Sequence, residues 1–169
     1  MTVAIVTGAS SGMGREFVRQ LSRYVTVDEI WAIARRTDAL EALKKLREAG
    51  CRLWLLSNAQ EVFTRYELQH LGLLDAFDGI YLSSCFGCRK PDIRFFRALL
   101  EEQKLDPTKC LMIGNDRETD IAGAKAAGLA TFYMHTALTP SHQSPADPNN
   151  PMEFEGDDWK EISEILLKI

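Results

Sequence analysis

The sequence lacks an excess of basic residues and lacks any long apolar run. It has 20 lysine and arginine residues against 24 aspartate and glutamate residues, a net charge of −4. Because nucleic acids and anionic membranes are bound by basic surfaces, this balance disfavours both as partners. No apolar run reaches the ~18 residues that span a bilayer, and residues 1–6 lead directly into a glycine motif, leaving no room for a signal peptide. We therefore expect a soluble, cytoplasmic protein with no evident partner, while its oligomeric state stays open.

Cysteine is also scarce, with four residues in 169. Cys85 and Cys88 have the C-x-x-C spacing of a redox pair or of half a zinc site. A zinc site needs two further ligands at suitable spacing, and none is evident. A thioredoxin-like pair would open a helix after a strand, whereas here the next helix is expected only after Pro91. We interpret the pair as reduced thiols near a strand end.

What the sequence does contain is a regular alternation of apolar runs and helical segments. Such alternation predicts an α/β protein with a doubly wound, three-layer, Rossmann-like parallel sheet. Right-handed crossovers favour the strand order 4-3-2-1-5-6. A chain of 169 residues has the size of one domain. The six expected strands lie within residues 3–8, 30–34, 52–58, 79–84, 110–115 and 130–135.

Four later segments have clear local signals. Thr37 and Asp38 can cap a helix that stops at Gly50. Phe95, Phe96, Leu99 and Leu100 fall on a helix between the fourth and fifth strands. Residues 137–156 contain four of the six prolines and are expected to be irregular. A C-terminal helix is expected from the spacing of Trp159, Ile162, Leu166 and Ile169.

The first turn has the Gly-x-x-x-Gly-x-Gly spacing between a strand and a helix. Gly8 would allow the tight turn, Gly12 would let a pyrophosphate approach, and Gly14 would let the helix pack on the strand. The helix N-terminus would then offer free N–H groups to the phosphates. The alternative is a glycine-rich turn that binds nothing.

Residues 1 to about 36 resemble the N-terminus of short-chain dehydrogenases/reductases. The resemblance implies weak NADP binding, with basic residues for the 2′-phosphate, although the arginines could equally be a solvated surface. Beyond residue 36 the resemblance fails, because no tyrosine is followed by lysine at the Tyr-x-x-x-Lys spacing that the family needs for proton transfer. The residues implied in cofactor binding are Gly8, Ser10, Ser11, Gly12, Met13, Gly14, Arg15, Arg35 and Arg36.

From about residue 39 to the C-terminus the sequence resembles haloacid dehalogenase-like phosphatases. "LLSN" supplies Ser57, which in that family holds phosphoryl oxygens, and "CRKPD" supplies Lys90, which neutralises charge. "IGNDRETD" supplies Asp116 and Asp120, an acidic pair that helps to place Mg²⁺. Positioning and charge neutralisation of this kind account for most of the catalysis of phosphoryl transfer.

The nucleophilic Asp-x-Asp motif of that family is missing. Only Asp28 and Asp38 precede Ser57, and neither lies in such a motif. Losing a covalent nucleophile can cost on the order of 10⁶ in turnover. Asp116 without a partner carboxylate should hold Mg²⁺ weakly. Ser57, Lys90, Asp116 and Asp120 are therefore interpreted as a vestigial set.

Together the two resemblances indicate an engineered chimera, a de novo scaffold with a dehydrogenase-like βαβ fragment at 1–38 and a phosphatase-like fragment at 39–169. On this interpretation the protein is not an enzyme and needs no cofactor. Two alternatives stay open, a weak NADP-binding module and a residual Mg²⁺-dependent phosphatase.

Overall fold

The computed structural model describes residues 3–6, 29–32 and 37–168. Strands β1 (Val3–Val6) and β2 (Glu29–Ala32) form a parallel pair. Strands β3 (Trp54–Ser57) and β4 (Gly79–Leu82) form a second parallel pair, in which Ser57 lies opposite Leu82. The third sheet is parallel throughout, in the order β5-β6-β7. Its strands are β5 (Leu111–Gly114), β6 (Ala130–His135) and β7 (Glu153–Glu155).

Helical segments follow nearly every strand, as expected for an α/β protein. The helices are α2 (Thr37–Glu48), α3 (Glu61–His70), α4 (Ser83–Phe86), α5 (Ile93–Glu102), α6 (Ala122–Ala126) and α7 (Trp159–Leu166). Two 3₁₀ turns, η1 (Leu74–Ala76) and η2 (Pro107–Lys109), and a π-helical turn, η3 (Arg117–Ile121), complete the described elements. The helix predicted to start near Thr37 and the C-terminal helix are both present.

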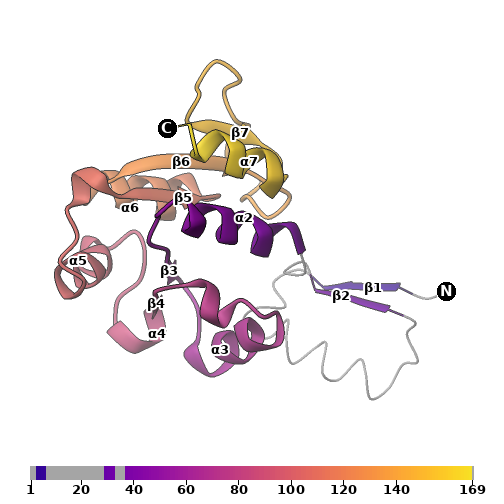
Figure 1. Cartoon of the computed structure of the whole chain (residues 1–169), viewed down its shortest axis with the longest axis horizontal. Helices are drawn as coiled ribbons and strands as arrows, with labels where there is room; N and C mark the ends of the chain where they lie inside the picture. Colours follow the sequence, from indigo (N-terminus) through magenta and orange to yellow (C-terminus); the bar gives the residue numbers. More distant parts are fainter. Residues whose placement is uncertain (1–2, 7–28, 33–36, 169) are drawn as a thin grey trace.

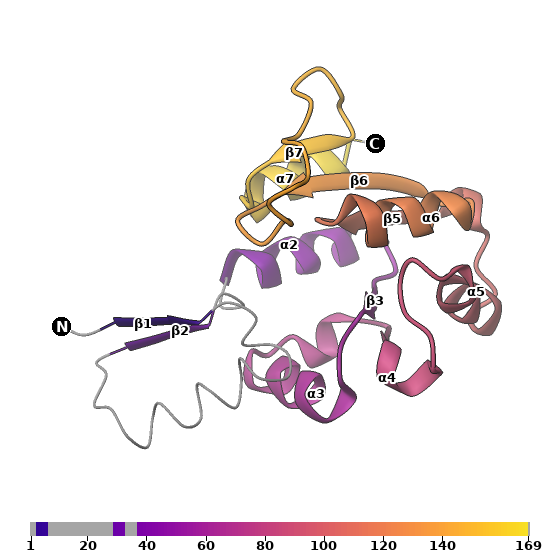
Figure 2. The same cartoon turned by 180° about the vertical axis from the view of Figure 1, so that it is seen from behind.

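The α/β fold with parallel strands is confirmed, but the predicted strand order 4-3-2-1-5-6 and the doubly wound layout are not. Three of the expected pairs of neighbouring strands are present and parallel, namely β1–β2, β3–β4 and β5–β6. Within the described residues, however, the strands form three separate sheets instead of one doubly wound sheet. Helix α2 packs against α7. Both views place the β1–β2 pair beyond the N-terminal end of α2, at the opposite end of the molecule from α5 (Figures 1 and 2). This placement separates the first two strands from the other sheets.

The core consists of two apolar clusters. Helix α5 contributes Phe95, Phe96 and Leu99 to the first, because these side chains recur on one helical face and meet Leu56 and Tyr81 from β3 and β4. The second cluster joins Phe132 and Met134 of β6 to Ile162 of α7. The α7 stripe predicted from sequence therefore packs on the third sheet.

The segment 137–156 contains one strand that was not predicted. Residues 153–155 form β7, which pairs in parallel with Tyr133, Met134 and His135. A three-residue strand next to Pro151 and Gly156 is too short to produce a periodic signal. The rest of the segment consists of turns and loops, as expected. Among the described residues, no helix is long and apolar enough to span a membrane.

Candidate functional site

The candidate site lies where β3 and β5 end. Ser57 is the last residue of β3, and Gly114 is the last residue of β5. Asp116 is the N-cap of the turn η3, which follows β5 directly. Lys90 lies in the loop between α4 and α5. The carboxyl ends of parallel strands are where α/β proteins place their ligands, so this arrangement brings the predicted phosphatase residues to a suitable edge.

Lys90 is the central residue of the site. Its side chain is buried, and its Nζ lies 2.6 Å from Oδ1 of Asp120 and 2.9 Å from the carbonyl oxygen of Leu56, to which it donates a hydrogen bond. A buried ammonium group is tolerated only with such partners, because desolvation of an unpaired charge is costly. The lysine thereby connects the end of β3 to the turn after β5.

Asn58 fixes the backbone of Lys90. Its Nδ2 donates to the Lys90 carbonyl oxygen at 3.0 Å, and its Oδ1 accepts from the Lys90 N–H at 2.8 Å. The sequence alone did not reveal this role of Asn58. The signal was its position directly after Ser57 at a strand end. Ser57, which is partly buried, therefore lies between two residues that both contact Lys90.

Asp120 is held against the end of β5. Its Oδ2 accepts hydrogen bonds from the backbone N–H groups of Asn115 at 3.1 Å and Asp116 at 3.2 Å. Glycine is required at position 114 because a Cβ there would overlap the Asp120 carboxylate. The Asp120 side chain thus receives backbone N–H groups on one oxygen and the Lys90 ammonium on the other.

Asp116 caps the η3 turn. Its Oδ1 accepts from the N–H groups of Glu118 at 2.9 Å and Thr119 at 3.0 Å, and from Nε2 of Gln143 at 2.9 Å. Burial raises the pKa of this carboxyl group, but the hydrogen bonds from Gln143, Thr119 and Glu118 outweigh burial and lower the pKa below its ordinary value. Asp116 therefore stays ionised, which a cation ligand requires.

The donor set fits a weakly bound Mg²⁺. Both Asp120 oxygens are already engaged, so Asp116 is the carboxylate of the set that could hold a cation. Among the described residues no group of three or more His, Cys, Asp or Glu side chains is arranged for a metal. Mg²⁺ is commonly held by one or two carboxylates together with substrate phosphate and water, which agrees with a single protein carboxylate.

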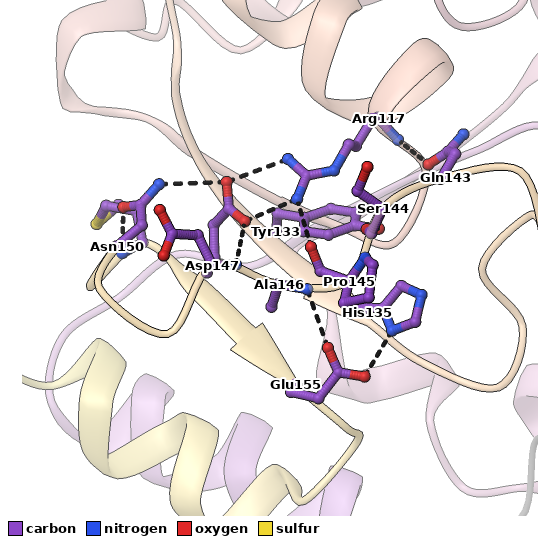
Figure 3. A network of polar contacts seen from close by, with 12 residues as sticks. Arg117, Tyr133, His135, Gln143, Ser144, Pro145, Ala146, Asp147, Asn150 and Glu155 are labelled. Atoms are coloured by element: carbon purple, nitrogen blue, oxygen red, sulfur yellow. Dashed lines mark hydrogen bonds and ion pairs between the residues drawn. The ribbon is translucent and has the colours of Figure 1, made fainter.

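A second polar network lies beside the acidic turn (Figure 3). Arg117 pairs with Glu153 at 2.7 Å, donates to the Pro145 carbonyl oxygen at 3.1 Å, and places its guanidinium carbon 3.8 Å from the centre of the Tyr133 ring. His135 and the Ala146 N–H both contact Glu155. Sequence reasoning missed this network because its members come from η3, β6 and the 137–156 segment, and only the tertiary structure brings these together.

The remaining predicted residues do not contribute to the described site. The glycine loop, with Gly8, Ser10, Ser11, Gly12, Met13, Gly14 and Arg15, lies outside the described residues, as do Arg35 and Arg36. All four cysteines are free thiols in the structure. Cys85 lies in α4, directly after β4.

The model of the haloacid dehalogenase-like hydrolase family matches residues 6–128. The chain therefore belongs to this family of hydrolases. It is 31% identical over 121 residues to a glyceraldehyde 3-phosphate phosphatase of Methanothermobacter thermautotrophicus, covering 72% of this chain and 54% of that protein. It is 32% identical over 127 residues to a phosphoglycolate phosphatase of Vibrio vulnificus, covering 75% and 54%. The chain spans about half the length of these curated relatives.

Solved structures give the same result for the fold. A protein from Listeria monocytogenes serotype 4b is similar with a TM-score of 0.66 and 26% identity, covering 99% of both chains. A HAD phosphatase from Thermococcus onnurineus has a TM-score of 0.65 at 22% identity, covering 89% of this chain and 63% of that one. The α/β fold with parallel sheets is therefore that of the haloacid dehalogenase superfamily.

These matches correct the interpretation of the chain as an engineered chimera without catalytic function. The family match begins at residue 6 and crosses residues 36–39, where the change of family was expected. The prediction that the protein is not an enzyme is also wrong, since the family is one of hydrolases and the curated relatives are phosphatases. None of these matches indicates a dehydrogenase segment or NADP. The error has a physical reason: a buried strand followed by a glycine-rich turn and a helix is common to many α/β folds.

Proposed function

We propose that this chain is a magnesium-dependent phosphatase that hydrolyses small phosphate monoesters. The observation that carries the proposal is the buried Lys90 beside Asp120 at the ends of β3 and β5. The curated relatives named above are phosphatases of small phosphorylated metabolites, which supports a substrate of the same size. We also propose that residues 1–169 act as one domain.

In this proposal Lys90 and Ser57 bind the phosphoryl group. The Lys90 ammonium has three N–H donors, and two of them are used by Asp120 and the Leu56 carbonyl oxygen. The third would donate to a phosphoryl oxygen and neutralise part of its charge. The Ser57 hydroxyl, at the end of β3, would donate a further hydrogen bond. Asn58, which follows Ser57 directly, fixes the position of Lys90 relative to Ser57 through its two hydrogen bonds to the Lys90 backbone.

Asp116 would hold the cation. Bound Mg²⁺ supplies charge neutralisation for the phosphate and for the transition state of its transfer. The lowered pKa of Asp116 keeps the carboxylate charged at neutral pH, so that the site retains its negative charge for the cation. Asp120 takes part through Lys90, whose ammonium it orients at 2.6 Å.

The absence of Asp-x-Asp before Ser57 points to direct attack by water. The water oxygen forms a bond to phosphorus, and the bond from phosphorus to the ester oxygen breaks. One water proton passes to the solvent and the leaving alkoxide takes up a proton from the solvent, which gives orthophosphate and an alcohol. Because a covalent nucleophile can be worth about 10⁶ in turnover, we expect slow hydrolysis.

Hydrolysis of p-nitrophenyl phosphate with and without Mg²⁺ tests the proposal. Lys90→Met should lower kcat/KM by about 100-fold or more, because removing one such charge-stabilising donor costs this much. Lys125→Met is the matched control, since Lys125 is an exposed lysine on α6. Equal rates for the two variants, or a rate that does not respond to Mg²⁺, would contradict the proposed function.

A further inference from the structure

Gln143 connects the 137–156 segment to the acidic turn. Its Nε2 donates to Oδ1 of Asp116 at 2.9 Å, and its Oε1 accepts from the Arg117 N–H at 2.7 Å. One amide group therefore bonds to two successive residues of the turn. Gln143 lies 27 positions from Asp116 in the chain, so that this contact is a tertiary one.

Hydrogen bonds of Gln143 itself and of the two residues that follow it fix the backbone at this position. Its backbone N–H donates to the Pro140 carbonyl oxygen at 2.9 Å. The next residue, Ser144, accepts the Tyr133 hydroxyl on its carbonyl oxygen at 3.2 Å, and the carbonyl oxygen of Pro145 accepts from Arg117 at 3.1 Å. Figure 3 shows Gln143 next to Arg117, with Ser144 and Pro145 following on the same side. The amide is therefore ordered before any ligand arrives.

The hydrogen bonds to the Asp116 carboxylate are concentrated on one of its two oxygens. The contacts from the Glu118 and Thr119 N–H groups and from Gln143 Nε2, at 2.9–3.0 Å, all end on Oδ1, and the Thr119 side chain also hydrogen bonds to the carboxylate. Two of these donors belong to the turn that Asp116 itself caps. Gln143 is the donor of the three that approaches from a separate part of the chain, so it restricts rotation of the carboxylate relative to the rest of the protein.

We propose that Gln143 is a positioning residue that fixes the Asp116 carboxylate through Oδ1 and leaves Oδ2 to bind a divalent cation. The inference rests on the proposed function, because it requires Asp116 to be the cation ligand. Partners that hold a ligating carboxylate or imidazole in this way contribute strongly to metal affinity, and their mutation typically costs 10- to 100-fold.

Calorimetric titration with MnCl₂ and MgCl₂, in the absence of any phosphate ester, tests the inference on the full chain. Gln143→Met keeps the length of the side chain and removes both hydrogen bonds. We expect its metal Kd to rise by about 10- to 100-fold. Ser144→Ala is the matched control, because it changes the adjacent exposed side chain and leaves the Ser144 carbonyl oxygen in place. The Tm of each metal-free variant shows that the fold is intact.

The outcomes separate the inference from the proposed function. If Gln143→Met binds metal as tightly as the wild type while Asp116→Asn does not, the role of Gln143 is overturned and the phosphatase proposal stands. If the wild type binds neither cation, or Asp116→Asn binds as the wild type does, the role of Gln143 is overturned, and the Mg²⁺ dependence of p-nitrophenyl phosphate hydrolysis decides the proposed function separately. Should Gln143→Met lower the metal-free Tm, Gln143→Asn replaces it, since the shorter amide cannot reach both partners. Wild-type affinity in that variant would equally refute the inference.

Discussion

Nζ of Lys90 and Oδ1 of Asp120 lie 2.6 Å apart, and their side chains are only 10% and 9% exposed. Only a small part of either charged side chain is exposed to water, so each charge depends on the other and on the backbone groups around them. Removing one member of such a pair leaves an uncompensated buried charge, whereas exposed ion pairs contribute little to stability. A substitution of either residue is therefore expected to change both the candidate site and the free energy of unfolding.

Asp120→Asn should lower the free energy of unfolding by about 3–5 kcal/mol, because the Lys90 ammonium then stays buried without its counter-ion. Denaturant unfolding monitored by circular dichroism measures the change. Arg65→Gln is the control, since the Arg65–Glu61 pair is exposed and its loss should not move the midpoint measurably. Equal midpoints for Asp120→Asn and the wild type would show that the pair is not desolvated.

Gly114→Ala should destabilise the protein by about 1–3 kcal/mol, the usual cost of overpacking. The new Cβ would overlap the Asp120 carboxylate, so that the aspartate has to leave its position beside the Asn115 and Asp116 N–H groups. Lys90 then loses its partner, and phosphatase activity should fall with stability. A crystal structure of the variant with Asp120 unmoved would contradict this expectation.

Ile162→Ala should lower the free energy of unfolding by about 2–5 kcal/mol, because it opens a cavity between α7 and β6 where Ile162 is fully buried. Leu167→Ala is the matched control, since Leu167 is 46% exposed and its truncation should change stability by less than about 0.5 kcal/mol. Urea unfolding curves measure both. Similar losses in the two variants would mean that α7 does not dock through its apolar face.

Local patterns in the sequence were sufficient to predict much of the fold. The apolar face of α5 and the C-terminal helix α7 follow from the spacing of their apolar residues, and both are present. The strand β7 and the separation of the sheets were missed, because pairing between distant segments depends on packing that a single sequence does not display. Lys90 and Asp120 were identified from their motifs, yet their contact became visible only in the structure.

Gln143 and Asn58 show why part of the site could not be predicted. Each acts through an amide that bonds to residues 27 or 32 positions away. Gln143 lies in a proline-rich segment without a periodic or motif signal, and the motif that contains Asn58 does not show which residue its amide contacts, so only the tertiary structure assigns these roles. The family boundary was misplaced for a related reason, because a glycine-rich turn between a strand and a helix is shared by several α/β folds.

The Arg117 guanidinium holds the pKa of Glu153 below its ordinary value through their side-chain hydrogen bonds, although burial acts in the opposite direction. The pKa of Glu153 is lower in the folded than in the unfolded state. Its contribution to the free energy of unfolding is therefore fully present at pH values above the unfolded-state pKa, and it is lost as the pH falls through the folded-state pKa. Glu153→Gln should therefore reduce Tm at neutral pH and approach the wild type as the pH is lowered from about 5 to about 2. Thermal unfolding at a series of pH values measures this convergence. A Tm difference that stays constant across the series would contradict the assignment of the shift to Glu153.

The proposed attack by water has a consequence that separates this chain from a phosphatase with a covalent nucleophile. Residues 1–56 contain no Asp-x-Asp, and in the proposed mechanism the phosphoryl group passes directly to water. We expect that acid quenching during turnover of p-nitrophenyl phosphate yields unmodified protein by intact-mass spectrometry. The first turnover should also show no burst of p-nitrophenol, because release of the alcohol and of orthophosphate occurs in one chemical step. A phosphorylated protein in the quenched sample would instead locate a nucleophile, and peptide mapping would identify it. That result would refute direct attack by water while leaving the roles of Lys90 and Asp116 to be tested by their own variants.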